Sequence, residues 1–320
     1  MKTTLVGYTG FVGGNLAASH RFDNLYNSAN ITTAFGADNG LVVYSGMPSE
    51  KFLANADPAA DLARAQGALE NIRAMRPERL VLISTVDVYR KPYGVYEDSP
   101  AGGDGLPAYG QNRLALEGWV RQEYPDALIL RLPGLFGRGL KKNFIYDIFN
   151  LTPATLTAAK YAELAEKNPL VAESYAQDDA GFYRLKKLPD EQAQALREFY
   201  RHNDFNATRF TDSRSVFQFY NLAQLWDDIG RCLKAGLKLV NLATEPVEAG
   251  MLYRTLFGAA FENHLDAPPF RYDMRTCYGR ELGGLDHYIA DRADVLAGIA
   301  RFARGAYGDA ALPPQEGATP

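Results

Sequence analysis

The chain of 320 residues is long enough for roughly two compact units, or for one large domain with an inserted lobe. Hydrophobic residues make up 47% of the sequence, which supports a sizeable core, and the formal net charge is -4. Because no basic stripe is present, the composition argues against nucleic acid or an anionic membrane surface as a partner. We expect a small-molecule ligand.

The use of cysteine and histidine bears on the compartment and on metal binding. Cys232 and Cys277 form neither a disulfide framework nor a metal-binding spacing, which is typical of a reducing compartment. The four histidines show no pairing at metal-ligand intervals, so we predict no metal site. We see no room for a signal peptide and no run of ~20 apolar residues, so the sequence predicts a cytoplasmic protein without a membrane segment.

Short apolar runs alternate with helical stretches along the first part of the chain. The runs at residues 4–6, 41–44, 80–83 and 128–130 are expected to be strands. Helices are expected from the Asp57-Pro58 cap to about Met75, and from Tyr109 to about residue 122. This order predicts an α/β fold, a doubly wound parallel sheet with helices on both faces.

Three glycines lie between the first predicted strand and the helix that follows it. Gly7, Gly10 and Gly13 provide a tight turn, a close approach of backbone to phosphate, and close helix-strand packing. The start of the helix adds free N–H groups for an anion. The alternative is an ordinary strand-turn-helix connection. We predict that NAD(P) contacts the run formed by Gly7, Thr9, Gly10, Phe11, Val12 and Gly13.

The segment between Gly13 and Leu41 is short for a helix, a second strand and a third, so one crossover helix is expected to be missing or reduced. Asp23 stands too close to Gly13 to be the ribose-binding carboxylate and is expected to precede the second strand. That strand would end at Asn27 and Ser28, which are neutral. No carboxylate repels a 2′-phosphate there and no arginine binds one, so NAD and NADP both stay open, with a slight preference for NADP.

Two residues are expected at the carboxyl edge of the sheet, where open parallel sheets bind ligands. Thr85 follows the strand predicted for residues 80–83, and Tyr109 begins the next helix. The segment around Pro133 closes the following strand. With the glycines, this set of motifs resembles the extended short-chain dehydrogenase/reductase family, particularly its nucleotide-sugar epimerases and dehydratases, over most of residues 1–140.

The resemblance implies a catalytic role for four residues. Tyr109 would be the general acid/base and the hydroxyl of Thr85 would bond the reacting oxygen. The family's lysine is replaced by Arg113, which can lower the pKa of Tyr109 and reach the cofactor ribose but does not relay protons. The family's dehydratases carry adjacent Asp and Glu after the threonine. This chain has Val86 and Asp87, which favours epimerase or carbonyl reductase chemistry.

The resemblance extends to further contacts and to the assembly. Cofactor contacts would include Ser45, Gly46, Met47, Pro133, Tyr109 and Arg113 besides the residues named above. Substrate contacts would be Asn143, Arg214, Arg271 and Arg275, which implies a nucleotide sugar as substrate. A homodimer would pair through the helices at residues 58–75 and 109–122.

The predicted architecture is a Rossmann-like dinucleotide-binding domain with a smaller, mainly helical substrate lobe. The domain takes residues 1–140 and about 210–245, and the lobe takes residues 141–209 and 246–310, with no buried strand expected over 151–206. Residues 311–320 read as a disordered tail. Two alternative functions stay open. One is a dinucleotide-binding sensor or scaffold without turnover, which Arg113 would allow. The other is a reductase of a carbonyl substrate that carries no nucleotide.

Overall fold

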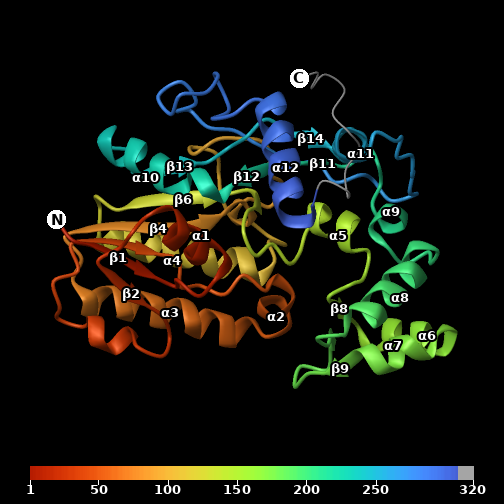
Figure 1. The fold of residues 1–320 in the computed structure, drawn as a ribbon. Helices are drawn as coiled ribbons and strands as arrows, with labels where there is room; N and C mark the ends of the chain where they lie inside the picture. Colours follow the sequence, from red (N-terminus) through yellow and green to blue (C-terminus); the bar gives the residue numbers. More distant parts are fainter. Residues whose placement is uncertain (309–320) are drawn as a thin grey trace. The chain divides into compact units, whose positions relative to one another are not determined.

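A computed structural model describes residues 1–308 of the chain (Figure 1). They fall into two compact units. The first unit holds residues 1–139, 216–247 and 271–302, and the second holds 140–215, 248–270 and the described residues from Ala303 onward. The tail predicted for residues 311–320 lies outside the described part of the chain.

The first unit is built on a six-stranded sheet in which all neighbouring strands are parallel, with the order β13-β6-β4-β3-β1-β2. The predicted α/β class is therefore confirmed. The strands are β1 (Thr3–Val6), β2 (Asn24–Tyr26), β3 (Leu41–Tyr44), β4 (Arg79–Thr85), β6 (Leu128–Leu132) and β13 (Leu239–Asn241). The strand order reverses between β1 and β3, and the two strands end side by side, with Val6 opposite Tyr44.

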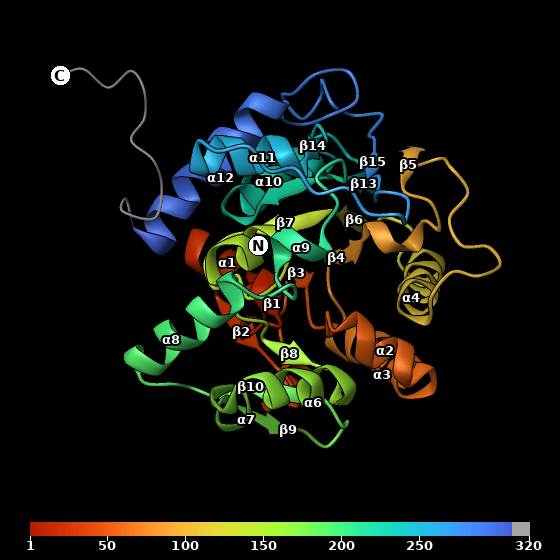
Figure 2. The same cartoon turned by 90° about the vertical axis from the view of Figure 1, so that its right-hand side faces the viewer.

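Helices cover both faces of this sheet (Figure 2). On one face, α3 (Pro58–Met75) and α4 (Ala108–Glu123) bury residues such as Ile72 and Val120 against the sheet. On the other face, α1 (Phe11–Ser19) and α10 (Leu225–Lys234) bury Leu16 and Ile229. Successive strand residues alternate between the two cores, since Leu5 joins one and Val6 the other.

The connection from β2 to β3 is short, as the sequence predicts. A 3-10 helix, η1 (Ile31–Ala34), stands where a crossover helix would be, and β2 pairs only with β1 in this sheet. Asp23 precedes β2, where its carboxylate accepts hydrogen bonds from the backbone N–H of Thr3 (2.7 Å) and from its hydroxyl (3.1 Å). Asp23 therefore lies at the amino edge of the sheet, away from the strand ends that bind ligands.

Shorter elements complete the first unit, and two of its small pairings are parallel, β12 with β7 and β15 with β5. These elements are α2 (Lys51–Ala56), η2 (Val86–Val88), β5 (Tyr93–Val95), β7 (Gly134–Phe136), β11 (Val216–Phe217), β12 (Phe219–Asn221), η3 (Leu222–Gln224) and β15 (Asp273–Met274). β14 (Val247–Glu248) and α12 (Arg292–Tyr307) contain residues of both units.

The second unit is mainly helical and has its own small core around Leu164, Leu196 and Tyr200. Its helices are α5 (Phe144–Asn150), α6 (Ala158–Lys167), α7 (Pro169–Ser174), α8 (Asp190–Arg201), α9 (Ala207–Phe210) and α11 (Ala249–Phe257).

This unit also contains a three-stranded antiparallel sheet, ordered β8-β10-β9. Its strands are β8 (Thr155–Leu156), β9 (Tyr175–Gln177) and β10 (Tyr183–Leu185). Leu156 and Tyr175 are buried, so the prediction that this region has no buried strand is wrong. Strands of two or three residues are too short to show an alternating pattern.

A charged network lies buried between α4 and the sheet of the first unit. The Glu117 carboxylate accepts hydrogen bonds from the guanidinium of Arg131 (2.6 and 3.0 Å) and from the hydroxyl of Ser84 (2.5 Å). Arg131 also donates to the hydroxyl of Tyr89 (2.6 Å). Because both charges are fully buried, each depends on the other for compensation.

We predict that Glu117→Ala lowers the free energy of unfolding by about 3–5 kcal/mol, since it leaves the Arg131 charge buried without a partner. Asp126→Ala is the matched control, because it removes an exposed carboxylate paired with Lys238 and should cost at most about 1 kcal/mol. Denaturant titration of the two variants checks this. Equal losses would contradict the account.

Candidate active site

The glycine run forms a tight cradle at the carboxyl end of β1. Gly7 has a positive φ of 90°, and a Cβ on it would lie 2.6 Å from the carbonyl oxygen of Ser45. A Cβ on Gly13 would lie 2.1 Å from the carbonyl oxygen of Gly7. Neither position can hold a side chain without movement of the backbone. Gly10 is less constrained, because its Cβ would lie 3.3 Å from the Gly7 oxygen.

The start of α1 lies directly behind this cradle. Gly10 is the N-cap residue and offers no side-chain hydrogen bond to the first turn, which leaves the N–H groups of that turn free of a side-chain cap. The side chains of Phe11 and Val12 pack against the core, whereas Thr9 is exposed. An uncapped helix start beside a glycine cradle, at the point where the strand order reverses, fits the pyrophosphate of a dinucleotide.

The ends of β2 and β3 flank the cradle. The backbone N–H of Gly7 bonds the carbonyl of Tyr26 at the end of β2 (2.7 Å). Asn27, the next residue, donates through its amide to the hydroxyl of Tyr8 (3.3 Å), and Ser28 is exposed beside it. After β3, the hydroxyl of Ser45 donates to the carbonyl of Val6 (2.8 Å).

Gly46 follows Ser45 at the surface, and Met47 packs half-buried against the core. Pro133 is buried in the connection from β6 to β7. Ser45, Gly46 and Met47 thus form a loop beside the glycine cradle, and their contact with a cofactor stays a prediction.

Polar side chains gather where β4 ends. The hydroxyl of Thr85, the last residue of β4, donates to the carboxylate of Asp87 (2.9 Å). Asp87 also accepts a hydrogen bond from the ammonium of Lys51 (2.8 Å), the first residue of α2. Tyr272 belongs to the same cluster, because both Lys51 and Asp87 act on its pKa, which burial raises.

Tyr109 lies on the first turn of α4 and is buried, with its backbone N–H bonded to the amide oxygen of Asn55 (3.0 Å). Burial raises the pKa of the phenol above its ordinary value. The charge of Arg113 opposes this, Asp87 adds to it, and Lys51 and hydrogen bonding from Thr85 also oppose it. From the cation alone, the sequence predicts a lowered pKa for Tyr109. The net direction is the reverse because the phenol is desolvated.

Arg113 stands one turn after Tyr109, and its guanidinium donates three hydrogen bonds. It forms a bidentate pair with Asp61 of α3 (2.9 and 3.2 Å) and donates to the carbonyl of Pro48 (2.6 Å). Arg113 is 4% exposed and Asp61 1%. The guanidinium carbon lies 4.5 Å from the centre of the Tyr109 ring, so Arg113 packs on the ring while its charge is compensated by Asp61.

Lys51, Asp61 and Tyr272 were not predicted from the sequence. Lys51 carries one weak signal, its position a few residues after the loop that ends β3. Asp61 and Tyr272 carry none, because nothing in their spacing relates them to Tyr109.

The four residues predicted to bind substrate are divided between the two units. In the second unit, Asn143 caps α5 with a positive φ of 104°, and Arg214 forms an ion pair with Asp212 (2.6 Å). In the first unit, Arg275 pairs with Asp273 (2.8 Å), whereas Arg271 is exposed and has no ion pair among the described residues.

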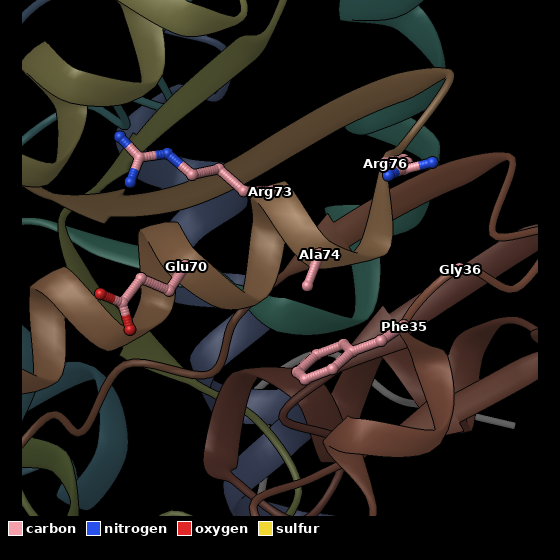
Figure 3. A pocket seen from close by; sticks show the side chains of 6 residues that line it. All are labelled: Phe35, Gly36, Glu70, Arg73, Ala74 and Arg76. Carbon is pink, nitrogen blue, oxygen red and sulfur yellow. The ribbon is translucent and has the colours of Figure 1, made fainter.

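A pocket elsewhere in the first unit contains none of these residues (Figure 3). It is lined by Phe35, Gly36 and residues near the end of α3, including Ala74. Arg73, which also lines it, points away from Phe35 and forms an ion pair with Glu123. α3 leads from its end into the start of β4, so this pocket lies near the amino edge of the sheet, away from the candidate site.

The described residues bear on metal binding and on membrane-spanning helices. Among residues 1–308, no group of three or more His, Cys, Asp and Glu side chains is placed to hold a metal ion. Within the same residues, no helix is both long and apolar enough to cross a membrane.

Comparison with solved structures gives long alignments at low sequence identity. The dTDP-4-dehydrorhamnose reductase of Yersinia enterocolitica is 13% identical with a TM-score of 0.59, over 94% of this chain and 98% of that one. The same enzyme of Bacillus anthracis, solved with NADP, is 13% identical with a TM-score of 0.57, over 96% and 100%. This chain has their fold.

A third structure, a dTDP-glucose 4,6-dehydratase from Streptomyces venezuelae solved with NAD, is 15% identical with a TM-score of 0.58, over 96% of this chain and 98% of that one. No protein-family model matches the sequence, and a search of curated proteins finds no match either. The Rossmann-like fold predicted from the motifs is confirmed.

We predict that Gly13→Ala weakens binding of NADH and NADPH by more than about tenfold, which corresponds to ~1.4 kcal/mol. The added Cβ would meet the carbonyl of Gly7 and force the cradle to open. Fluorescence titration of the reduced nicotinamide measures the affinity.

Gly14→Ala is the matched control, because its Cβ would lie 3.5 Å from the nearest atom, the carbonyl oxygen of Tyr8. This variant should bind as the parent does, and thermal melting should confirm that both variants fold. If Gly13→Ala keeps the parent affinity, the cradle is not the phosphate site.

Proposed function

We propose that this protein is an NAD(P)-dependent enzyme of the extended short-chain dehydrogenase/reductase family that reduces or epimerises a nucleotide-linked sugar. The observation that carries the proposal is the cluster of Thr85, Asp87 and Tyr109 at the carboxyl edge of β4, in the same unit as the glycine cradle. A nicotinamide dinucleotide would supply or accept the hydride. Gly7, Gly10, Gly13 and the first turn of α1 would hold its pyrophosphate, and the loop at Ser45–Met47 and Pro133 would border it.

The electrostatics of Tyr109 support the direction of proton transfer. Because burial raises its pKa, the phenol keeps its proton at neutral pH and is suited to donate it to a carbonyl oxygen that receives a hydride. The hydroxyl of Thr85 would bond the same oxygen. In the reverse direction Tyr109 must first lose its proton, so oxidation should accelerate as the pH rises toward that pKa.

The chemistry of Asp87 favours reduction or epimerisation over dehydration. Its carboxylate is shared between the Thr85 hydroxyl and the Lys51 ammonium, and the residue before it, Val86, is a buried apolar side chain. Its neighbours in the chain, Val86 and Val88, are apolar, so no adjacent carboxylate completes an acid and base pair for the loss of water.

Recognition of a nucleotide diphosphate would depend most on Arg271, whose charge is uncompensated by an ion pair in the described chain. Arg275 would have to exchange its aspartate partner for the phosphates, and a role of Arg214, in the second unit, stays a prediction of the sequence. The neutral end of β2, at Asn27 and Ser28, tolerates a 2′-phosphate and supports NADP slightly over NAD. A homodimer and a cytoplasmic location stay predictions of the sequence.

A second function is favoured by one observation. The Asp61 carboxylate compensates the charge of Arg113, so the residue that replaces the family's lysine is held as a structural group. A protein that binds a dinucleotide without turnover, as a sensor or scaffold, would fit this arrangement.

The two functions are separated by Tyr109→Phe, which removes the ionisable proton and keeps the ring. We expect kcat to fall by ~10²- to 10⁴-fold while the affinity for NADH or NADPH changes less than about twofold. The assay follows reduced nicotinamide absorbance with UDP-, dTDP-, GDP- and CDP-linked sugars and their keto forms. Chromatography of the sugar products detects epimerisation, which causes no net change in the dinucleotide.

Tyr124→Phe is the control, since Tyr124 caps the far end of the same helix and should leave kcat unchanged. A Tyr109→Phe variant as active as the parent on its best substrate would refute the catalytic role of Tyr109. Bound dinucleotide without turnover of any of these sugars would support the sensor.

A further inference from the structure

The phenol of Tyr109 needs a source of protons. Arg113 is the nearest cation by sequence, but it is held between Asp61 and the carbonyl of Pro48. A guanidinium also stays protonated in proteins, so it cannot deliver a proton. Another group must therefore restore the proton that Tyr109 gives up.

Lys51 is the second cation near the ring. Its ammonium nitrogen lies 5.9 Å from the centre of the Tyr109 ring and 2.7 Å from the nearer carboxylate oxygen of Asp87. The same carboxylate is bonded to the Thr85 hydroxyl (2.9 Å). The Lys51 side chain is 53% exposed, so the cluster reaches solvent at this residue, whereas Tyr109 is buried.

Hydrogen bonds join Lys51 to Asp87 and Asp87 to Thr85, and Thr85 lowers the pKa of the buried Tyr109 phenol. All four residues belong to the first unit, and they come from α2, η2, β4 and α4. We propose that Lys51, rather than Arg113, is the solvent end of the proton path to Tyr109.

The inference rests on the proposed function for its chemical step. When Tyr109 donates its proton to the substrate oxygen, its O–H bond breaks and a phenolate is left. Lys51 gives a proton to the Asp87 carboxylate, the Thr85 hydroxyl turns from Asp87 to the phenolate and passes its hydrogen to it, and Thr85 takes the proton of Asp87 in return. Lys51 recovers its proton from water. The two electrons of the reduction come from the reduced dinucleotide, so one turnover consumes one hydride and one proton.

The surroundings of Lys51 are consistent with this path. Partial removal from water lowers its pKa, but the Asp87 carboxylate, Tyr272 and Tyr109 together raise it above the ordinary value, so the ammonium is charged at neutral pH. Lys51 acts through Asp87 and Thr85 and does not itself touch the reacting atoms. It is a positioning residue for Tyr109 in this account.

The test compares Lys51→Met, which removes the charge, with Lys51→Arg, which keeps it. In the full-length protein, ¹³C-labelled tyrosine NMR follows the titration of Tyr109, assigned by the signal that Tyr109→Phe removes. We expect Lys51→Met to raise the pKa of Tyr109 by about one unit and to lower kcat by ~10²-fold. Lys51→Arg should leave that pKa near the parent value and still lower kcat, because arginine holds its proton.

Chemical rescue provides a readout that a purely structural role would not produce. Ethylammonium should restore part of the activity of Lys51→Ala. Lys238→Met is the matched control, since Lys238 is an exposed lysine with an aspartate partner (2.8 Å) outside this cluster. It should change neither kcat nor the titration of Tyr109.

The proposal is overturned if Lys51→Met keeps the parent kcat and the parent titration of Tyr109, or if Lys51→Arg is as active as the parent. Loss of activity without a shift in Tyr109 and without rescue also overturns it, since that pattern is structural. If the parent turns over no sugar and binds no dinucleotide, the proposed function fails, and the NMR titration still decides whether Lys51 is coupled to Tyr109.

Discussion

The ion pair between Arg113 and Asp61 is the interaction on which the candidate site depends. It joins α4 to α3, and Asn112 strengthens it by donating to the same Asp61 carboxylate (3.0 Å). Because both charges are buried, removing either one should cost several kcal/mol, about 3–5 for pairs of this kind. The guanidinium that Asp61 holds packs on the Tyr109 ring. The pair thus holds the Arg113 guanidinium against the Tyr109 ring.

The two cations near the Tyr109 phenol make different contacts. Arg113 has the geometry for a bidentate carboxylate and serves the packing of the helices, whereas Lys51 is exposed and shares Asp87 with Thr85. The balance of charges leaves Tyr109 protonated, because burial and Asp87 outweigh the two cations and Thr85. A site of this kind is better suited to give a proton to a carbonyl than to take one from a hydroxyl.

Much of the frame could be predicted from the sequence, because the strand at Leu41–Tyr44 and the Asp57-capped helix follow local rules of periodicity and capping. The glycine spacing predicted the cradle for a similar reason, because the local backbone requires glycine at Gly7 and Gly13. The small sheet of the second unit was missed, because strands as short as Thr155–Leu156 show no period. Lys51 and Asp61 were missed as well, since their roles come from contacts across distant segments that no spacing encodes.

A crystal structure of the protein with a reduced nicotinamide dinucleotide tests the central claim most directly. The account predicts a pyrophosphate over Gly7, Gly10 and Gly13, Arg113 still paired with Asp61, and Lys51 bonded to Asp87 beside Tyr109. A dinucleotide bound elsewhere would contradict the site. Arg113 released from Asp61 and bonded to the cofactor ribose, with Lys51 turned away from Asp87, would contradict the separation of a structural from a chemical cation.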